Sequence, residues 1–166
     1  MSGWDLYIYG QLVHSQQKNG EWLKDVTTEA AIIGKEDGKI QACTPGFKLG
    51  EYPYEVLAED GINKKPVQVN EVNMLKAAVL DGKTTISEAG LRINNTKYMM
   101  ANYDPARKLA YLSKSGGGAC AMATKNLIIF ATYENKKKMS NGIEQNAGEC
   151  NEVVEKVADS LIKVGS

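Results

Sequence analysis

The sequence predicts an α+β domain in which two terminal helices pack on one face of an antiparallel β-sheet. Residues 147–164 carry apolar side chains at three- and four-residue spacing, which is typical of a helix with one buried face. Residues 4–13 are also expected to be helical. Between these helices, strand-like segments alternate with tight turns. Because parallel strands need long crossovers, such short turns favour an antiparallel sheet.

The composition excludes several classes of protein. The chain has 166 residues, and we expect residues 1–166 to form a single domain. Twenty basic residues balance twenty acidic ones, which argues against nucleic acid as the main partner. Hydrophobic residues make up 43% of the chain, as in globular proteins. Because no apolar run approaches a membrane span and no secretory signal is evident, we expect a cytoplasmic protein.

The first predicted helix, residues 4–13, has an unusually wide apolar surface. Ser2 is its predicted N-cap, and Asp5 lies near the positive end of the helix dipole. The apolar residues cover more of the circumference than one buried stripe requires. We therefore expect some aromatic side chains to be partly exposed or to contact another molecule. The apolar residues are Trp4, Leu6, Tyr7, Ile8, Tyr9, Leu12 and Val13.

The middle of the chain is predicted to form hairpins. Asp37-Gly38 is a strong hairpin turn, and Asn94-Asn95 tolerates the left-handed conformation that tight turns need. Glycines 116–118 are expected to form another turn. A further hairpin at 54–69 is expected to project from the body, followed by a helix at 70–80. The predicted strands are residues 29–34, 39–43, 91–93, 97–101, 108–113, 119–124 and 126–133.

The last predicted helix, residues 147–164, has the clearest periodicity. Its polar face carries two acidic–basic pairs four residues apart, each adding about 0.2–0.5 kcal/mol of helix stability. Gly148 is expected to precede the helix and Gly165 to follow it, as start and stop signals. The predicted buried face consists of Cys150, Val153, Val154, Val157, Ala158, Leu161 and Ile162.

These motifs, in this order, resemble the profilin family. The most specific similarity is the segment 148–156, Gly-Glu-Cys-Asn-Glu-Val-Val-Glu-Lys, and it covers the start of the last helix. The resemblance extends over nearly the whole chain, and the enlarged middle is similar to protist-type profilins. Segments 18–24 and 54–69 look like additions. The resemblance implies the profilin fold, with shorter helices on the second face of the sheet. The other matching segments are 3–7, 30–34 with 37–38, 90–91 with 96–99, and 116–118.

The resemblance implies a surface that binds monomeric actin and regulates actin polymerisation. This surface would comprise the start of the last helix and the adjoining strands. Without the resemblance, its asparagine is better explained by local backbone bonding and its lysines by solvated strand positions. Glu152 departs from the family because many profilins carry a basic or neutral residue there, which would alter charge complementarity. The implied actin-binding residues are Lys97, Lys114, Gly148, Asn151 and Glu152.

The resemblance also implies a second surface, between the terminal helices, for proline-rich proteins such as formins. Polyproline II loses little entropy on docking, so flat aromatic faces suffice to hold it. Trp4 and Tyr7 match two aromatic positions, although core packing also explains them. Truncating an aromatic hot spot costs about 2 kcal/mol or more, so we expect weakened peptide binding. Leu161 keeps an apolar position, whereas Gln41, Ser160 and Ser166 replace side chains that are commonly aromatic.

No catalytic site, metal site or cofactor is expected. His14 is the only histidine, and Cys43, Cys120 and Cys150 form no C-x-x-C pair and are expected to be buried and inert. Glycines 116–118 lack the spacing of a phosphate-binding loop. Two alternatives stay open. One is a non-enzymatic sensory or trafficking module of α/β/α layering that binds another protein or a small ligand, and the other is a small cysteine-dependent enzyme.

A basic run, Lys136-Lys137-Lys138, follows the last predicted strand. The resemblance implies that such surface lysines could bind phosphoinositide headgroups, although a solvated loop explains them as well. The expected molecule is a cytoplasmic monomer associated with the cytoskeleton.

Overall fold

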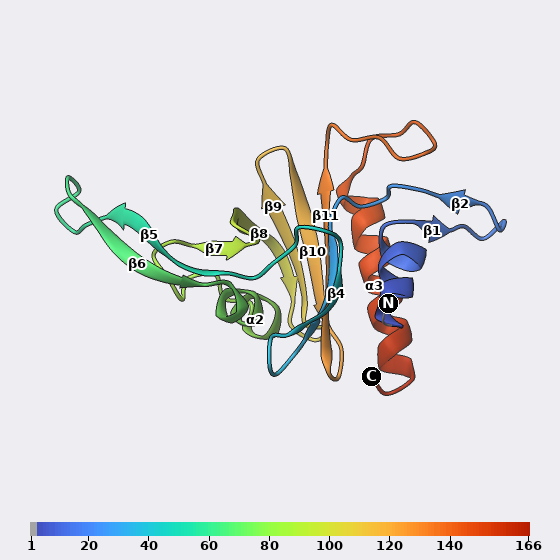
Figure 1. Cartoon of the computed structure of the whole chain (residues 1–166), viewed down its shortest axis with the longest axis horizontal. Coiled ribbons are helices and arrows are strands. Elements are labelled where there is room, and N and C mark those ends of the chain that lie inside the picture. Colours follow the sequence, from blue (N-terminus) through green and yellow to red (C-terminus); the bar gives the residue numbers. More distant parts are fainter. Residues whose placement is uncertain (1–2) are drawn as a thin grey trace.

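A curved antiparallel sheet separates two helical layers in the computed structural model, which describes residues 3–166 (Figure 1). The predicted N-cap Ser2 lies outside the described residues. The helical elements are α1 (Trp4–Tyr7), the π-helical η1 (Ile8–Leu12), α2 (Glu71–Asp81) and α3 (Ala147–Lys163).

The sheet has seven strands in the order β4-β3-β11-β10-β9-β8-β7, and all neighbours are antiparallel. Every predicted strand is present to within two residues at each end, except that β8 extends three residues further. The short turns therefore predicted the pairing correctly. The strands are β3 (Ala30–Gly34), β4 (Ile40–Cys43), β7 (Leu91–Ile93), β8 (Thr96–Asp104), β9 (Leu109–Lys114), β10 (Gly117–Ala123) and β11 (Leu127–Glu134).

The N-terminal helix follows the prediction in extent but changes type after one turn. Residues 4–7 are α-helical and residues 8–12 form a π-helical turn. Ile8 and Leu12 are fully buried against α3, whereas Leu6 is 70% exposed. The aromatic side chains Trp4 and Tyr7 are half-buried, which confirms the expected partial exposure.

Helix α3 matches the predicted last helix to within one residue. Its N-cap is Asn146, whose side chain accepts a hydrogen bond from the backbone N–H of Glu149 at 3.0 Å. The prediction that Gly148 precedes the helix is therefore wrong, because Gly148 lies in its first turn. The predicted apolar face is buried except at Ile162, which is 46% exposed.

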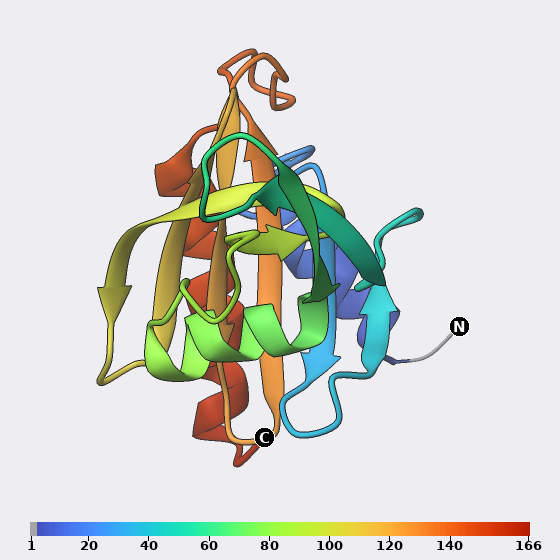
Figure 2. The same cartoon turned by 90° about the vertical axis from the view of Figure 1, so that its left-hand side faces the viewer.

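The two faces of the sheet support separate cores. Side chains that alternate along β9, β10 and β11 pack either against α3 and η1 or against α2. On β11, for example, Ile129 faces the α3 side and Phe130 the α2 side. Within residues 3–166 the second face carries one helix, α2, where more than one shorter helix was expected (Figure 2).

Two hairpins stand outside the main sheet. The first, β5 (Glu51–Leu57) with β6 (Lys64–Asn70), projects from the body as an arm (Figure 1). It confirms the predicted projecting hairpin and begins three residues earlier than expected. The second, β1 (Ser15–Gln16) with β2 (Trp22–Leu23), was not predicted. It lies beside the N-terminal helix, on the α3 side of the molecule.

Candidate functional site

The start of α3 presents a polar surface. Gly148 and Glu152 are exposed, and Asn151 is half-buried. The side-chain hydrogen bond to the backbone at the start of α3 is made by Asn146, which accepts from the Glu149 N–H, and not by Asn151. Within residues 3–166 the Asn151 side chain takes part in no hydrogen bond. Its amide can therefore offer both a donor and an acceptor to a partner.

Next to α3, part of the same sheet face is uncovered. Helix α3 packs on β10 and β11, while β8 lies two strands from β10, a separation of about 10 Å. Tyr98 of β8 is 3% exposed in the α2-side core, so its neighbours Lys97 and Met99 point away from that core. Both are exposed, Met99 to 69%.

Met99 is a residue that the sequence prediction missed. Its large apolar side chain stands on an open sheet face, where a partner protein could cover it. The signal was available in the alternation of β8, where Met99 follows the buried Tyr98. The start of α3 with Asn151, together with Lys97 and Met99 on β8, is called the α3–β8 surface below.

Arg107, in the turn between β8 and β9, fixes α3 over the sheet. Its guanidinium donates to the carboxylates of Glu155 and Asp159 on α3, the latter at 2.8 Å. Hydrogen bonds to Glu155 and then to Asp159 raise the pKa of Arg107, which stays charged. The α3–β8 surface is therefore held in one geometry by a contact between its two halves.

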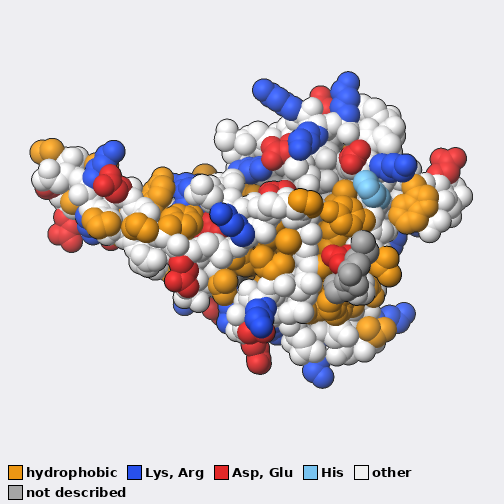
Figure 3. Space-filling view, viewed as in Figure 1, with side chains coloured by type: hydrophobic (Ala, Val, Ile, Leu, Met, Phe, Trp, Pro, Cys, Tyr) orange, Lys and Arg blue, Asp and Glu red, His pale blue; other side chains and the backbone are white. Residues whose placement is uncertain are grey.

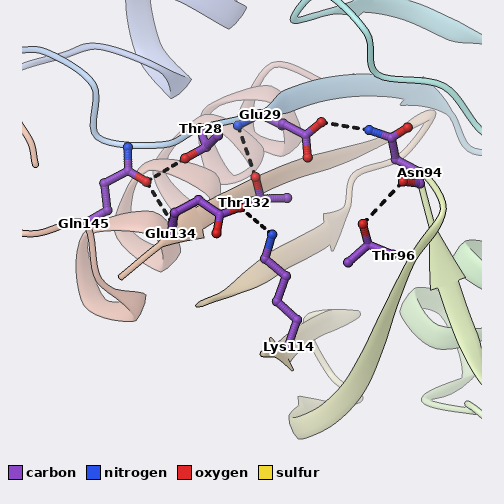
Figure 4. A network of polar contacts seen from close by, with 8 residues as sticks. All are labelled: Thr28, Glu29, Asn94, Thr96, Lys114, Thr132, Glu134 and Gln145. Atoms are coloured by element: carbon purple, nitrogen blue, oxygen red, sulfur yellow. Dashed lines mark hydrogen bonds and ion pairs between the residues drawn. The ribbon is translucent and has the colours of Figure 1, made fainter. Parts of the chain in front are cut away.

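Lys114 lies on the opposite face of the sheet, above the α2-side core (Figure 4). Its ammonium donates to Glu134 Oε1 at 2.6 Å and lies 5.9 Å from the centroid of the Tyr98 ring. In the register, Gly117 of β10 stands between Lys114 of β9 and Glu134 of β11, so this ion pair spans a strand. The structure thus separates Lys114 from Lys97, Gly148, Asn151 and Glu152.

A chain of polar contacts continues from this ion pair (Figure 4). The backbone N–H of Glu134 donates to Gln145 Oε1 at 2.9 Å, and Thr28 Oγ1 donates to the same oxygen at 2.7 Å. Gln145 is 3% exposed and also donates to the Asp25 carbonyl at 2.8 Å. Lys114 therefore belongs to a hydrogen-bond network that links the end of the sheet to the loop before β3.

The residues predicted for proline-rich peptides meet on the other side of α3. The Trp4 and Tyr7 rings lie 5.4 Å apart at 45° and rest on the α3-side core. Gln41 is exposed on β4, which α1 contacts. Leu161 is only 3% exposed, so it packs in the core beneath this surface and offers a ligand little accessible area. Ser160, one residue earlier, is exposed and offers no ring.

Comparison with known proteins identifies the family. The model of the Profilin family matches residues 2–166. The chain belongs to the profilin family. A Profilin from Tetrahymena pyriformis is 34% identical over 166 residues, 99% of both chains. As a profilin, the protein is an actin-binding regulator of polymerisation.

Solved profilins share its fold. Acanthamoeba castellanii profilin IB is 24% identical, with a TM-score of 0.65 over 99% of this chain and 100% of the other. Mouse profilin IIa, solved in complex with a double repeat from the FH1 domain of mDia1, is 17% identical. Its TM-score is 0.57 over 99% of this chain and 100% of the other.

The thiols of this profilin are poorly placed for chemistry. Cys120 and Cys150 are fully buried, and burial raises the pKa of Cys150 to about 12 and that of Cys120 well above its ordinary value. Cys43 is half-buried, less than the sequence predicted, and burial also raises its pKa. His14 Nδ1 accepts a hydrogen bond from the backbone N–H of Asp25 at 3.1 Å. In residues 3–166, no cluster of three or more His, Cys, Asp or Glu side chains could hold a metal ion.

The predicted basic run lies in the loop between β11 and α3 of this profilin. Lys136, Lys137 and Lys138 are exposed. Lys137 and Lys138 line a hollow of about 300 Å³ together with Asp25 and Gln145. Phosphoinositide binding at this loop stays a prediction. None of the helices in residues 3–166 is long and apolar enough to span a membrane.

Proposed function

We propose that this profilin binds monomeric actin through the α3–β8 surface. The observation that carries the proposal is the uncovered sheet face beside the start of α3, where Met99 is 69% exposed. By covering one end of the actin monomer, the docked profilin would block spontaneous nucleation. It would act as a cytoplasmic monomer beside the cytoskeleton. The proposed contacts are Lys97, Met99, Gly148, Asn151 and Glu152, without Lys114.

The α3–β8 surface has the make-up of a protein interface. Met99 supplies an apolar centre, and methionine is enriched at interfaces. Asn151 supplies directional hydrogen bonds, and the charges of Lys97 and Glu152 lie at its rim. Because Arg107 holds α3 against the β8–β9 turn, little ordering would accompany docking.

Met99→Asp is expected to weaken actin-monomer binding about tenfold or more, because a charge would replace an apolar contact at the centre of the interface. The measurement is the delay in pyrene-actin assembly as a function of profilin concentration, with Asn151→Asp as a second variant. Val164→Asp is the matched control, since Val164 is 73% exposed at the C-terminal end of α3, the opposite end of that helix from the tested surface. Equal nucleation delays for Met99→Asp, Asn151→Asp and the parent would contradict the proposed surface.

We also propose that proline-rich peptides dock on Trp4 and Tyr7. The mouse profilin IIa complex supports this ligand class, and the paired half-buried rings support the location. Because Gln41 and Ser160 present no rings, the docking surface is narrow. Proline-rich elongation factors such as formins would be its partners, with weakened affinity.

Trp4→Ala is expected to weaken polyproline binding about 30-fold, the equivalent of one aromatic hot spot of about 2 kcal/mol. Titration calorimetry with a polyproline peptide gives the comparison, and the parent itself is expected to bind more weakly than micromolar. Tyr9→Ala is the control, because Tyr9 is 43% exposed on another side of the same helix. A micromolar parent, or equal affinities for Trp4→Ala and Tyr9→Ala, would refute this part of the proposal.

Both proposed activities are docking events without bond chemistry. Thiols with raised pKa values stay protonated at neutral pH and are poor nucleophiles, which argues against the cysteine-dependent enzyme. The sensory or trafficking alternative predicts no effect on actin. The pyrene-actin assay therefore separates it from the proposed function.

A further inference from the structure

The β1–β2 hairpin displays a tryptophan. Leu23 is 8% exposed and packs into the α3-side core, so the preceding Trp22 points outward and is 50% exposed. Hydrophobic side chains are visible on this hairpin, beside those of the N-terminal helix, in Figure 3. A half-exposed tryptophan on a two-residue strand contributes little to the core, which suggests a role in recognition.

The hairpin is held rigidly. Lys24, next to Trp22 and Leu23, exchanges two hydrogen bonds with Ser140. The Lys24 N–H donates to Ser140 Oγ at 2.8 Å, and the Ser140 N–H donates to the Lys24 carbonyl at 3.0 Å. The Gln17 N–H also donates to the Glu21 carbonyl at 2.7 Å and closes the turn. A ligand that stacks on Trp22 would therefore meet a preorganised ring.

A hollow of about 340 Å³ separates Trp22 from the N-terminal helix and α3. Gln11 lines it and lies four residues after Tyr7, within the π-helical turn η1, so the hollow lies about one turn further along the N-terminal helix than the Tyr7 ring. At the α-helical rise of 1.5 Å per residue, seven residues would place Gln11 about 10 Å along the helix from Trp4, and the π-helical turn makes this an upper bound. The Trp4–Tyr7 surface thus leads into the hollow. Its full lining is Gly10, Gln11, Ser15, Gln16, Gln17, Trp22 and Lys156.

The chemistry of the hollow suits a proline-rich backbone. Such a segment has no N–H groups on its prolines and offers only carbonyl acceptors and flat rings. Trp22 supplies a ring and an indole donor, and Gln11 and Lys156 supply an amide and an ammonium. No heavy atom lies within 4 Å of the position that a Gly10 Cβ would take, so a ligand can approach the backbone there.

We propose that the hollow beside Trp22 is a second subsite for the proline-rich segment that docks on Trp4 and Tyr7. The inference rests on the proposed peptide function and extends it. At 3.1 Å per residue, a polyproline II segment needs about three to four more residues to reach Gln11 from Trp4. Trp22 then supplies an aromatic contact at one end of the extended peptide-binding surface, and Gln41 and Ser160, which present no rings, lie toward the other end. The profilin would select for longer proline-rich segments.

Two peptides, of about three and about fourteen prolines, test the subsite. At 3.1 Å per residue the shorter one is only about 9 Å long, so it cannot cover the Trp4 and Tyr7 rings and also enter the hollow, whereas the longer one can. Trp22→Ala is expected to leave the Kd for the short peptide unchanged and to raise the Kd for the long peptide about tenfold. Comparing variant and parent on each peptide cancels the statistical advantage of a longer repeat. Trp22→Tyr keeps a ring with a donor and is expected to restore most of the loss.

Fluorescence gives an independent readout. The chain has two tryptophans, so Trp4→Phe leaves Trp22 as the single indole. Saturation with the long peptide is expected to shift its emission, and the short peptide is not. If Trp4→Ala weakens binding but Trp22→Ala binds both peptides like the parent, the subsite is refuted while the proposed peptide function stands. If the parent binds neither peptide, both are refuted.

Discussion

Glu71→Ala is expected to lower the free energy of unfolding by about 3–5 kcal/mol. The Glu71 carboxylate is 1% exposed, and both of its oxygens are used. Oε1 accepts the Gly50 N–H at 2.9 Å, and Oε2 accepts the Tyr52 hydroxyl at 2.7 Å and the Asn95 N–H at 2.8 Å. Alanine would leave three donors without their acceptor, each costing about 1–3 kcal/mol.

The position of Glu71 explains why this effect is large. It is the first residue of α2 and follows β6 directly, and its partners come from the base of the arm and the β7–β8 turn. Arg92 extends the same contacts, since its Nε donates to the Tyr52 hydroxyl at 3.2 Å and its guanidinium lies 4.3 Å from the Tyr54 ring centroid. One carboxylate therefore sets how the arm leaves the body.

Urea unfolding followed by circular dichroism measures the change. Glu71→Gln keeps the shape but places an amide donor against other donors, so its expected loss is smaller, about 1–3 kcal/mol. Glu55→Gln removes a charge from an exposed position on β5 and is expected to be neutral. Parent-like unfolding of Glu71→Ala would show that the carboxylate does not hold the arm.

Much of the fold could be predicted because its local signals are strong. The apolar periodicity of α3 and the Asp-Gly and Asn-Asn turns each specify structure within a few residues. The β1–β2 hairpin escaped prediction because its strands have two residues each, too few for alternation to be visible. The burial of Glu71 escaped because an acidic residue in the first turn of a helix is ordinarily solvated, and its partners are distant in sequence.

The binding surfaces were only partly predictable. Family resemblance assigned Asn151 to the actin-binding surface and Trp4 to the peptide-binding surface. It could not show on which face of the sheet each strand residue lies. Lys114 and Lys97 looked equivalent in sequence, yet strand register puts Lys114 on the α2 side, paired with Glu134. Met99 was overlooked because its exposure follows from the packing of Tyr98 and from how far α3 extends over the sheet.

The second large effect on stability is expected at Gly117, the first residue of β10. Gly117 lies in β10 between Lys114 and Glu134, and their ion pair passes over it because glycine has no side chain. A Cβ at Gly117 would lie 2.1 Å from the Tyr133 carbonyl oxygen and 3.2 Å from Lys114 Cε. The backbone oxygen cannot move without separating β10 from β11, so the glycine is required by close approach and not by its own φ.

Gly117→Ala is therefore expected to lower the free energy of unfolding by about 2–4 kcal/mol, from overpacking and from loss of the Lys114–Glu134 ion pair. Gly116→Ala is the matched control, because Gly116 has φ +75 and open space around its Cβ position. Its expected cost is the left-handed strain alone, about 1–2 kcal/mol. Urea unfolding ranks the two variants, and a greater loss for Gly116→Ala would show that backbone conformation, rather than contact across the strands, demands glycine in this turn.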